Sequence, residues 1–530
     1  MKTQTLAPPA PPFGPPAALA GTLVTTVPAG QAAGPLALYR ALLAERGPAG
    51  TALLESAGPD LPTTRRSVVV ARAALRLELR GTEALVRALD PAAEPLAAAL
   101  ADRVDALGAR RAEGALSDAE RLTLPGPLDV VRAGAGLLAD DEPGVPLAPG
   151  LFGAFSYELV DRFEELPARR RDPQDTPDAS FVLAGDTLVF DHRRGEVHVV
   201  TRALPNEGVA AARARHADYL ALLSNAAPVR PLAAASGPIE RPGAAPDVTD
   251  ERFLSDVETL RGHIDAGDIF QAVLSRGFSM QSTADPLDVY AALRAANPSP
   301  YLFHLDLGCR RLLGASPETF LRVEDGNLEI RPIAGTVPRG FGADGTIDAD
   351  LDRRLALQLL LDEKERAEHA MLLDLARNDV ARVAEPGTTE VVQQFEVERY
   401  SHVQHLVSRV RGRLRGGLDA LHAYRAVANM GTLTGAPKLR AMELIRELEP
   451  AGRGFYGGAA GFVLQDGSLD TCIVIRSLLH SGGTYSTRAG AGVVWDSDPA
   501  SELAETAHKA RACLEAVARA ERLAAVEVTP

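Results

Sequence analysis

Two glutamates in the segment 363–379 point toward what should be the buried side of a helix. At about 100° per residue, Glu365 and Glu368 fall on one stripe of apolar side chains. The leucines of that stripe are Leu357, Leu361, Leu372 and Leu375. Buried carboxylates cost free energy unless they are paired or bind a metal. These positions therefore need either a cation or a partner.

A second glutamate pair with the same spacing occurs near the C-terminus. Glu502 and Glu505 share one face of a helix predicted to begin at Pro499, with Asp498 as its cap. The same face carries Lys509, Cys513 and Ala516. Two inward pairs on two helices could share one hard cation, and Mg²⁺ prefers oxygen ligands that join protein to an anionic substrate.

An ordinary interpretation of both helices stays open at this point. Charge-dense helices are usually solvated and linked by salt bridges, and Lys509 could simply neutralise Glu505. The coincidence of two inward pairs makes the metal site as good an interpretation as the ordinary one. It does not identify a reaction.

Composition excludes some partners. The 530-residue chain carries a net charge of −14, which disfavours nucleic acid or an anionic membrane as its main partner. An anionic substrate would need local cations. No apolar run is long enough to span a membrane. The three cysteines, Cys309, Cys472 and Cys513, show no metal spacing, and their scarcity predicts the reducing cytoplasm.

Strand and helix signals alternate along the chain and predict an α+β protein with large antiparallel sheets covered by helices. Alternation over 75–80 predicts a half-buried strand, and hairpins are expected over 181–200 and around Asp325-Gly326. Alanine-rich stretches near 83–114 and 208–223 are expected to be helices.

Proline- and glycine-rich stretches divide the chain into regions. We predict a flexible lead-in at 1–30, an N-terminal region at 31–225, a linker at 226–247 and a catalytic domain at 248–520.

A series of ordered motifs carries a resemblance to a known family. They are "LLES" (53–56), "GDIFQAVLSR" (267–276), "NPSPY" (297–301), "GASPE" (314–318), "RPIAGTVPRG" (331–340), "AEHAMLLDLARNDVARV" (367–383), "YGGAAGF" (456–462), "DTCIVIRS" (470–477) and "AGAGVVWDSDPASELAETAHKA" (489–510). The chain resembles the chorismate-utilising enzymes, most closely the large subunits of anthranilate synthases. The resemblance implies a four-layer α/β/β/α sandwich with the active site in one cleft.

The resemblance assigns the glutamates to Mg²⁺. Glu368 and Glu505 would hold the ion that binds the ring carboxylate of chorismate, with Glu502 as a further metal ligand. Glu365 would be an inner-shell or water-linked carboxylate, and it is also the expected general acid when the 4-hydroxyl leaves. This explains why two helices direct carboxylates inward.

The resemblance also assigns substrate and proton-transfer roles. His405 would move the ring proton in the second half-reaction, a task that suits a group titrating near neutrality. A lone histidine on the apolar face of a strand is otherwise a core residue. Arg476 would pair with the enolpyruvyl carboxylate, because a planar guanidinium binds carboxylates bidentately. The other implied chorismate contacts are Gly335, Thr336, Tyr456, Gly490, Ala491, Gly492 and Lys509, with Thr336 also among the expected catalytic residues.

Two positions favour ammonia as the nucleophile. Related enzymes that attack the ring with a lysine place it where this chain has Ala334, and those that activate water place a lysine at Gln271. An aminodeoxyisochorismate synthase of the phenazine type, which stops before pyruvate loss, is the enzymatic alternative. A non-catalytic tryptophan-binding protein is the other. Leu274 and Gly277 depart from the family pattern and leave only local loop geometry open.

The resemblance further implies a partner and an inhibitor. Because the three cysteines lack a glutaminase setting, a separate glutamine amidotransferase subunit is expected, in a heterotetramer of two synthase and two glutaminase chains. L-Tryptophan would inhibit from a site formed by Ser56, Pro300, Tyr301 and Leu302. Taken alone, "LLES" could be a strand end and "NPSPY" a turn.

Overall fold

The computed structural model describes residues 17–56, 66–107, 122–123, 125–140, 144–227, 243–342, 344–400 and 403–527. Its α-helices are α1 (Pro35–Arg46), α2 (Glu94–Leu107), α4 (Pro127–Ala135), α5 (Val209–Asn225), α6 (Asp250–Asp265), α7 (Pro286–Ala296), α8 (Ala349–Leu361), α9 (Glu363–Ala381), α10 (Ala420–Val427), α11 (Lys438–Leu448) and α12 (Pro499–Glu527). None of these helices is both long and apolar enough to cross a membrane.

Two long strands organise the sheets. β4 (Arg66–Arg80) and β8 (Ala179–Asp191) pair with each other throughout, and their register shifts between Val70 and Leu75. Such irregularities bend strands, so each half of the pair continues into a different sheet. The alternating leucines that predicted a strand at 75–80 lie in β4, and this prediction is confirmed.

The first sheet contains one half of the β4–β8 pair and extends outward from both strands. Its order is β2 (Gly21–Pro28), β9 (Glu196–Ala203), β8, β4, β3 (Ala52–Glu55), β12 (Tyr301–Asp306), β13 (Arg310–Ser316), β22 (Ser477–Ser481), β23 (Thr484–Val493), β11 (Gln271–Gln281), then β10 (Ala245–Pro246) and β19 (Gly435–Ala436).

The second sheet begins at the other ends of the same two strands. Its order is β5 (Glu83–Ala88), β4, β8, β7 (Gly150–Phe155), β20 (Ala459–Leu464), β21 (Leu469–Ile473), β14 (Thr319–Glu324), β15 (Asn327–Ile330), β18 (Val403–Arg413), with β16 (Ile333–Pro338) and β17 (Glu390–Arg399) both pairing with β18. These pairings are antiparallel; β1 (Ala17–Ala18) and β6 (Leu138–Ala139) form a separate parallel pair.

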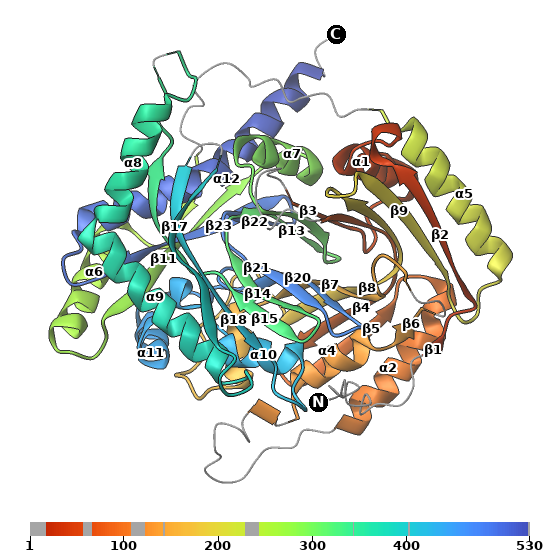
Figure 1. Ribbon diagram of the computed structural model, residues 1–530, viewed down its shortest axis with the longest axis horizontal. Helices are drawn as coiled ribbons and strands as arrows, with labels where there is room; N and C mark the ends of the chain where they lie inside the picture. Colours follow the sequence, from red (N-terminus) through yellow and green to blue (C-terminus); the bar gives the residue numbers. More distant parts are fainter. Residues whose placement is uncertain are drawn as a thin grey trace.

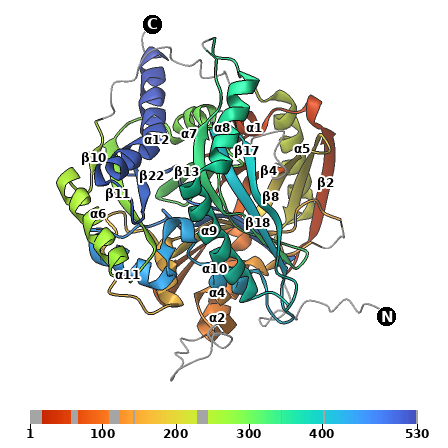
Figure 2. The same cartoon turned by 60° about the vertical axis from the view of Figure 1, so that its left-hand side comes forward.

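Three apolar cores separate four layers. One core lies between the sheets and joins Phe303 of β12 to Phe152 of β7. A second lies under α1, α5, α7 and α12, and a third under α2, α4, α9 and α10. Figure 2 shows helices above and below the strands. The predicted α/β/β/α sandwich is confirmed.

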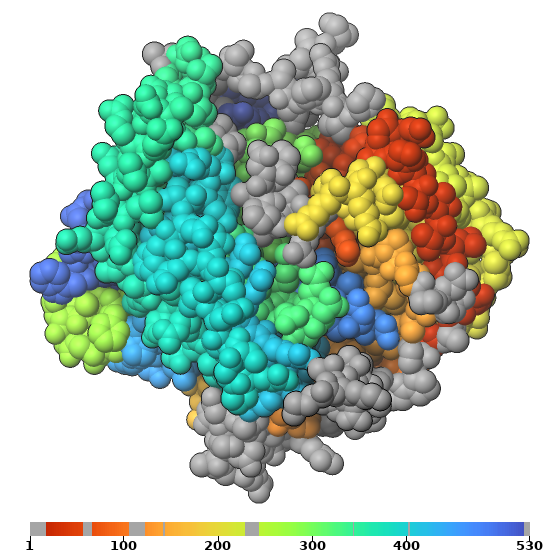
Figure 3. Space-filling view, in the orientation of Figure 1, coloured from red at the N-terminus to blue at the C-terminus, as the bar shows by residue number. Residues whose placement is uncertain are grey.

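Both sheets contain strands from both halves of the sequence. β3 pairs with β12 in the first sheet, and β7 pairs with β20 in the second. Figure 1 shows α8 and α9 on one side of the molecule and α1 and α5 on the other, and Figure 3 shows the same division on one face. Most of the predicted linker lies outside the described residues.

Three local predictions need correction. The flexible lead-in was expected to reach residue 30, but β2 (Gly21–Pro28) pairs along its length with β9, because its β-branched residues suit a strand. Residues 83–88 form β5 rather than a helix. The helix over 357–375 is broken at Asp362, whose extended backbone ends α8 and whose side chain caps α9. The leucine stripe therefore fails at Leu357 and Leu361, which are exposed.

Candidate active site

The two glutamate pairs lie on α9 and α12, as predicted. Asp362 begins α9 by accepting a hydrogen bond from the Glu365 backbone N–H at 3.0 Å. Asp498 caps α12 by accepting from the Ser501 N–H at 2.8 Å. On α12, Glu502 is buried and Glu505 is half-buried, while Cys513 and Ala516 continue the same face into the core. The face predicted for α12 is confirmed.

The carboxylates on the two helices influence one another. The pKa of Glu368 is raised, first by burial and also by Glu505, against the Gln271 amide, which donates to Glu368 Oε1 at 3.3 Å. The pKa of Glu365 is raised by burial and then by Glu368. Burial and Glu505 likewise raise the pKa of Glu502. Each carboxyl would therefore ionise more readily beside an added cation.

The donor set fits a hard cation that keeps part of its own hydration. Within the described part of the chain, the Oε2 atom of Glu502 is buried without a hydrogen-bond partner. Among the described residues, no three acidic, histidine or cysteine side chains converge closely enough to hold an ion by themselves. An ion here would therefore take remaining ligands from water and an anionic substrate, as Mg²⁺ commonly does. Lys509 partly neutralises Glu505, because its Nζ lies 2.5 Å from Glu505 Oε1.

Two glycines of β23 keep the floor of the site open. A Cβ on Gly490 would lie 2.8 Å from the Tyr456 hydroxyl, and one on Gly492 would lie 2.8 Å from Gln271 Nε2. At Gly490 a Cβ would also lie 2.9 Å from Val273 Cγ1, so a side chain does not fit there, whereas at Gly492 the flexible Gln271 amide would have to move. Lys509 Nζ donates to the Gly490 carbonyl at 3.0 Å, so this lysine joins α12 to the glycine strand. Ala491, between the two glycines, is fully buried.

Arg476 supplies a free guanidinium beside these groups. It is half-buried, has a φ of 49°, and makes no side-chain hydrogen bond or ion pair within the described part of the chain. Its charge opposes protonation of His405 and favours ionisation of Tyr456, which places it near both. An unpaired arginine in a strained backbone conformation is suited to receiving an anion.

His405 is held with one nitrogen available. Its Nδ1 lies 3.2 Å from the Gly335 carbonyl and 3.0 Å from Thr336 Oγ1. A carbonyl only accepts, so Nδ1 carries the proton and Nε2 keeps its lone pair. The contact depends on a register shift in β16 at Gly335, whose φ is 63°. Burial lowers the pKa of His405 to about 4, so the ring is neutral at pH 7 and can act as a base.

Glu318 is a site residue that the sequence predictions left without a role. Its side chain is buried, its Oε1 has no hydrogen-bond partner, and burial raises its pKa to about 8 against the opposing effects of Thr432 and Lys509. Glu318 is also close enough to Tyr400 to add to the rise in the Tyr400 pKa that burial causes. The centroids of the Tyr400 and His405 rings lie 5.2 Å apart. Glu318 is the last residue of the motif "GASPE" quoted above, and this motif is the sequence signal that could have identified it.

A separate cavity of about 620 Å³ contains the four residues predicted to bind tryptophan. Ser56, Pro300, Tyr301 and Leu302 all line it, and none of the predicted metal or chorismate residues does. The Ser56 hydroxyl is buried and has no hydrogen-bond partner among the residues that the structure describes. The Leu302 side chain belongs to the core under α7, whereas Tyr301 packs against the core between the sheets.

Comparisons with known proteins agree with this geometry. The model of the family described as chorismate binding enzyme matches residues 82–515. The chain belongs to this family. The matched range includes α9, the part of α12 up to residue 515, and every predicted metal and chorismate residue.

Several chorismate binding enzymes are similar to the chain over most of its length. "Anthranilate synthase component 1" of Escherichia coli is 43% identical, with 92% of this chain and 95% of that protein covered. "Anthranilate synthase component 1, pyocyanine specific" of Pseudomonas aeruginosa is 45% identical over 87% and 89%. Anthranilate synthase component I of Streptococcus pneumoniae, a solved structure, has a TM-score of 0.69 and 31% identity, covering 86% of this chain and 93% of that one.

Proposed function

We propose that the chain is the large subunit of an anthranilate synthase, which converts chorismate and ammonia to anthranilate, pyruvate and water. One observation carries the proposal: the glutamates of α9 and α12 raise one another's pKa values, and the neighbouring Gln271 and Ala334 supply no amine. The similar anthranilate synthases support it. The test is formation of anthranilate from chorismate and ammonium with Mg²⁺.

The chemistry divides between two groups with opposite protonation. Ammonia adds at C2 of the ring while the 4-hydroxyl departs, which requires a proton donor. Glu365 is the general acid that the resemblance implies, and its pKa is raised by burial and by Glu368. Glu318, whose pKa burial raises to about 8, is protonated at neutral pH and is a second candidate for this role. Neutral His405 then accepts the ring proton as pyruvate leaves. Thr336 and Gly335 fix the imidazole for that step.

The bound substrate would be oriented by its two carboxylates. Arg476 would take the enolpyruvyl carboxylate, with Tyr456 as a second donor. Glu368, Glu505 and Glu502 do not converge closely enough in the described structure to hold an ion by themselves, so they would share Mg²⁺ with water and the ring carboxylate, with Glu365 water-linked. The ion would neutralise the ring carboxylate and polarise it. The Gly490–Gly492 backbone would lie against the anion because no side chain intervenes there.

Glu318→Gln should lower kcat by roughly 10²-fold or more while changing KM for chorismate little, because an amide keeps the shape but cannot deliver a proton. The alkaline limb of the pH–rate profile near the pKa of Glu318 should also disappear. Glu365→Gln is the comparison. If it, rather than Glu318→Gln, removes the alkaline limb, Glu365 is the acid.

Ammonia would come from a separate glutaminase subunit, in a complex of two chains of each kind. Among the described cysteines, Cys472 and Cys513 are buried, and Cys309 is exposed. Burial raises the pKa of both the Cys472 and the Cys513 thiol, so neither is an activated nucleophile. The unpaired thiols also support the cytoplasm as its location.

L-Tryptophan would inhibit the enzyme from the 620 Å³ cavity. Inhibition requires that tryptophan favour a conformation that binds chorismate poorly, so the coupling must be reciprocal. Ser56→Phe should relieve inhibition by at least about tenfold, because the ring fills space and removes a buried hydroxyl, and the uninhibited rate should stay near that of the unmutated chain.

The measurement is anthranilate formation against tryptophan concentration at several chorismate levels. Ser224→Phe on the exposed face of α5 is the control. An unchanged inhibition curve in Ser56→Phe would remove Ser56 from the site. If tryptophan does not inhibit the unmutated chain at all, the proposed regulation is wrong. The chain would then be an unregulated enzyme, the alternative that the name of the pyocyanine-specific relative suggests.

A further inference from the structure

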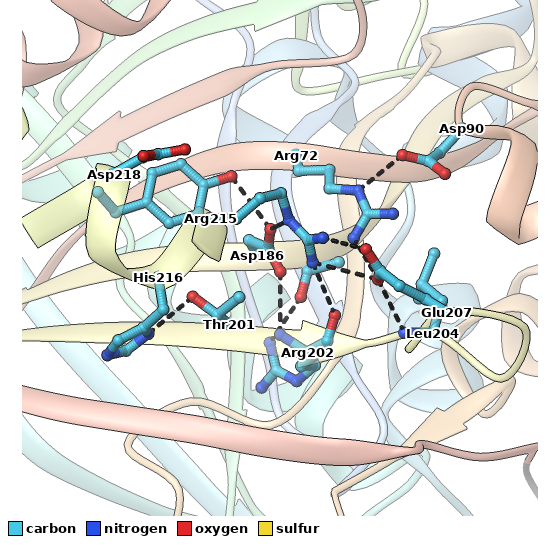
Figure 4. Close-up of polar contacts among 12 residues, drawn as sticks. Arg72, Asp90, Asp186, Thr201, Arg202, Leu204, Glu207, Arg215, His216 and Asp218 are labelled. Atoms are coloured by element: carbon cyan, nitrogen blue, oxygen red, sulfur yellow. Dashed lines mark hydrogen bonds and ion pairs between the residues drawn. The ribbon is translucent and has the colours of Figure 1, made fainter. Parts of the chain in front are cut away.

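A fully buried arginine lies behind the wall of the 620 Å³ cavity. Arg202 of β9 has no exposed surface. Figure 4 shows it within a network that joins β4, β8, β9 and α5. Its backbone N–H donates to Asp186 at 2.9 Å, and its carbonyl accepts from Arg215 at 3.3 Å. Burying a cation this deeply is costly unless its partners are well placed.

The Arg202 side chain turns from this network toward the cavity wall. Its Nε and one terminal nitrogen donate to the two carboxylate oxygens of Asp140, at 2.7 and 3.0 Å. The same terminal nitrogen donates to the Leu147 carbonyl at 2.6 Å, and the other lies 3.4 Å from the Gly185 carbonyl. Asp140 also accepts from Thr22 at 3.1 Å. Three groups are thus fixed by one guanidinium.

Asp140 and Leu147 belong to the cavity wall itself. Residues 144–149 line the cavity together with Asp140, on the chain between β6 and β7. Among the described residues, the hydrogen bond from Arg202 to Leu147 is the single one that links the 144–148 stretch to another element. Pro149 is held separately, by Gln465 at 2.8 Å. Arg202 therefore fixes the backbone of this wall at Leu147, whose side chain packs in the core between the sheets.

We propose that Arg202 is a positioning residue for the regulatory ligand: by clamping Asp140 and Leu147 it sets the shape of the cavity that would receive L-tryptophan. The inference rests on the proposed regulatory role of that cavity. Arg202 itself does not line the cavity and lies outside the metal and chorismate residues, so its effect should fall on inhibitor affinity and leave catalysis unchanged.

The test compares Arg202→Lys with Arg215→Lys. Lysine keeps the charge but loses the planar fork, so it cannot hold Asp140 and Leu147 together. Arg215 shares the network, through Asp186 and Glu207, but does not contact the wall. Arg202→Lys should weaken L-tryptophan binding by about tenfold or more, as expected for lost charged hydrogen bonds. Chorismate KM and uninhibited kcat should change less than about twofold, and Arg215→Lys should leave tryptophan binding unchanged.

Binding would be measured by equilibrium dialysis with labelled L-tryptophan, and inhibition by anthranilate formation, at a temperature well below unfolding. Asp140→Asn, which leaves Arg202 in place, provides a second variant if Arg202→Lys does not fold, and it should weaken tryptophan binding in the same direction. Unchanged affinity in the folded variants, or equal loss in Arg215→Lys, would overturn the positioning role. Absence of any tryptophan binding by the unmutated chain would instead remove the regulatory site, and this inference with it.

Discussion

Glu368→Gln is expected to reduce Mg²⁺-dependent anthranilate formation by roughly three orders of magnitude or more, because the amide retains the size of the side chain and loses the charge that binds the ion. The pKa of Glu368 is raised by burial and by Glu505, so an added cation would favour its ionised form. Thermal unfolding should be nearly unchanged, since removing a buried charge relieves repulsion.

Glu363→Gln is the matched control, because Glu363 lies on the same helix and is exposed. The measurements are anthranilate fluorescence against Mg²⁺ concentration and the thermal unfolding temperature of each variant. If Glu368→Gln turns over like the control, the assignment of the metal to α9 and α12 is wrong.

His405→Met should block anthranilate formation while amination continues. The second step needs a base, and methionine has about the same bulk with no proton acceptor of comparable strength. Because His405 Nδ1 donates to the Gly335 carbonyl, Nε2 is the nitrogen that can accept the ring proton, and the substitution removes it. The aminated, pyruvyl-bearing intermediate should accumulate, and anthranilate should fall by roughly 10²-fold or more, within the range of general acid–base contributions.

Chromatography with mass detection separates the two products, and His508→Met, at an exposed position of α12, is the control. Equal loss of both steps would place His405 in substrate binding or folding. No loss of either would return it to the role of a buried core histidine.

The sequence predicted those features that depend on local pattern. Alternation over 75–80 gave a strand of β4, and Asp325-Gly326 gave the β14–β15 hairpin, in which both residues have positive φ. The inward face of α12 followed from helical spacing within one helix. The stripe on α9 did not extend back to Leu357, because a capping aspartate starts a new helix at Asp362 and resets the phase.

Other features depend on contacts distant in sequence. The raised pKa of Glu318 comes from burial by elements distant in sequence, and no local sequence pattern predicts burial of that kind. Leu302 lines the predicted tryptophan cavity and also belongs to the core under α7, a second contact that the sequence did not predict. Arg202 has an ordinary strand sequence around it, and its clamp on Leu147 depends on the folding of a segment 55 residues earlier.

The most direct test uses the purified chain with chorismate, Mg²⁺ and ammonium at alkaline pH, where more of the nucleophile is free ammonia, with the product identified by mass. Parallel reactions replace ammonium with glutamine, or remove Mg²⁺ with a chelator. The proposed function predicts anthranilate and pyruvate in equal amounts from ammonium with Mg²⁺, and no anthranilate from glutamine or without the metal. An aminated product that retains the pyruvyl group, or no consumption of chorismate at all, would contradict it.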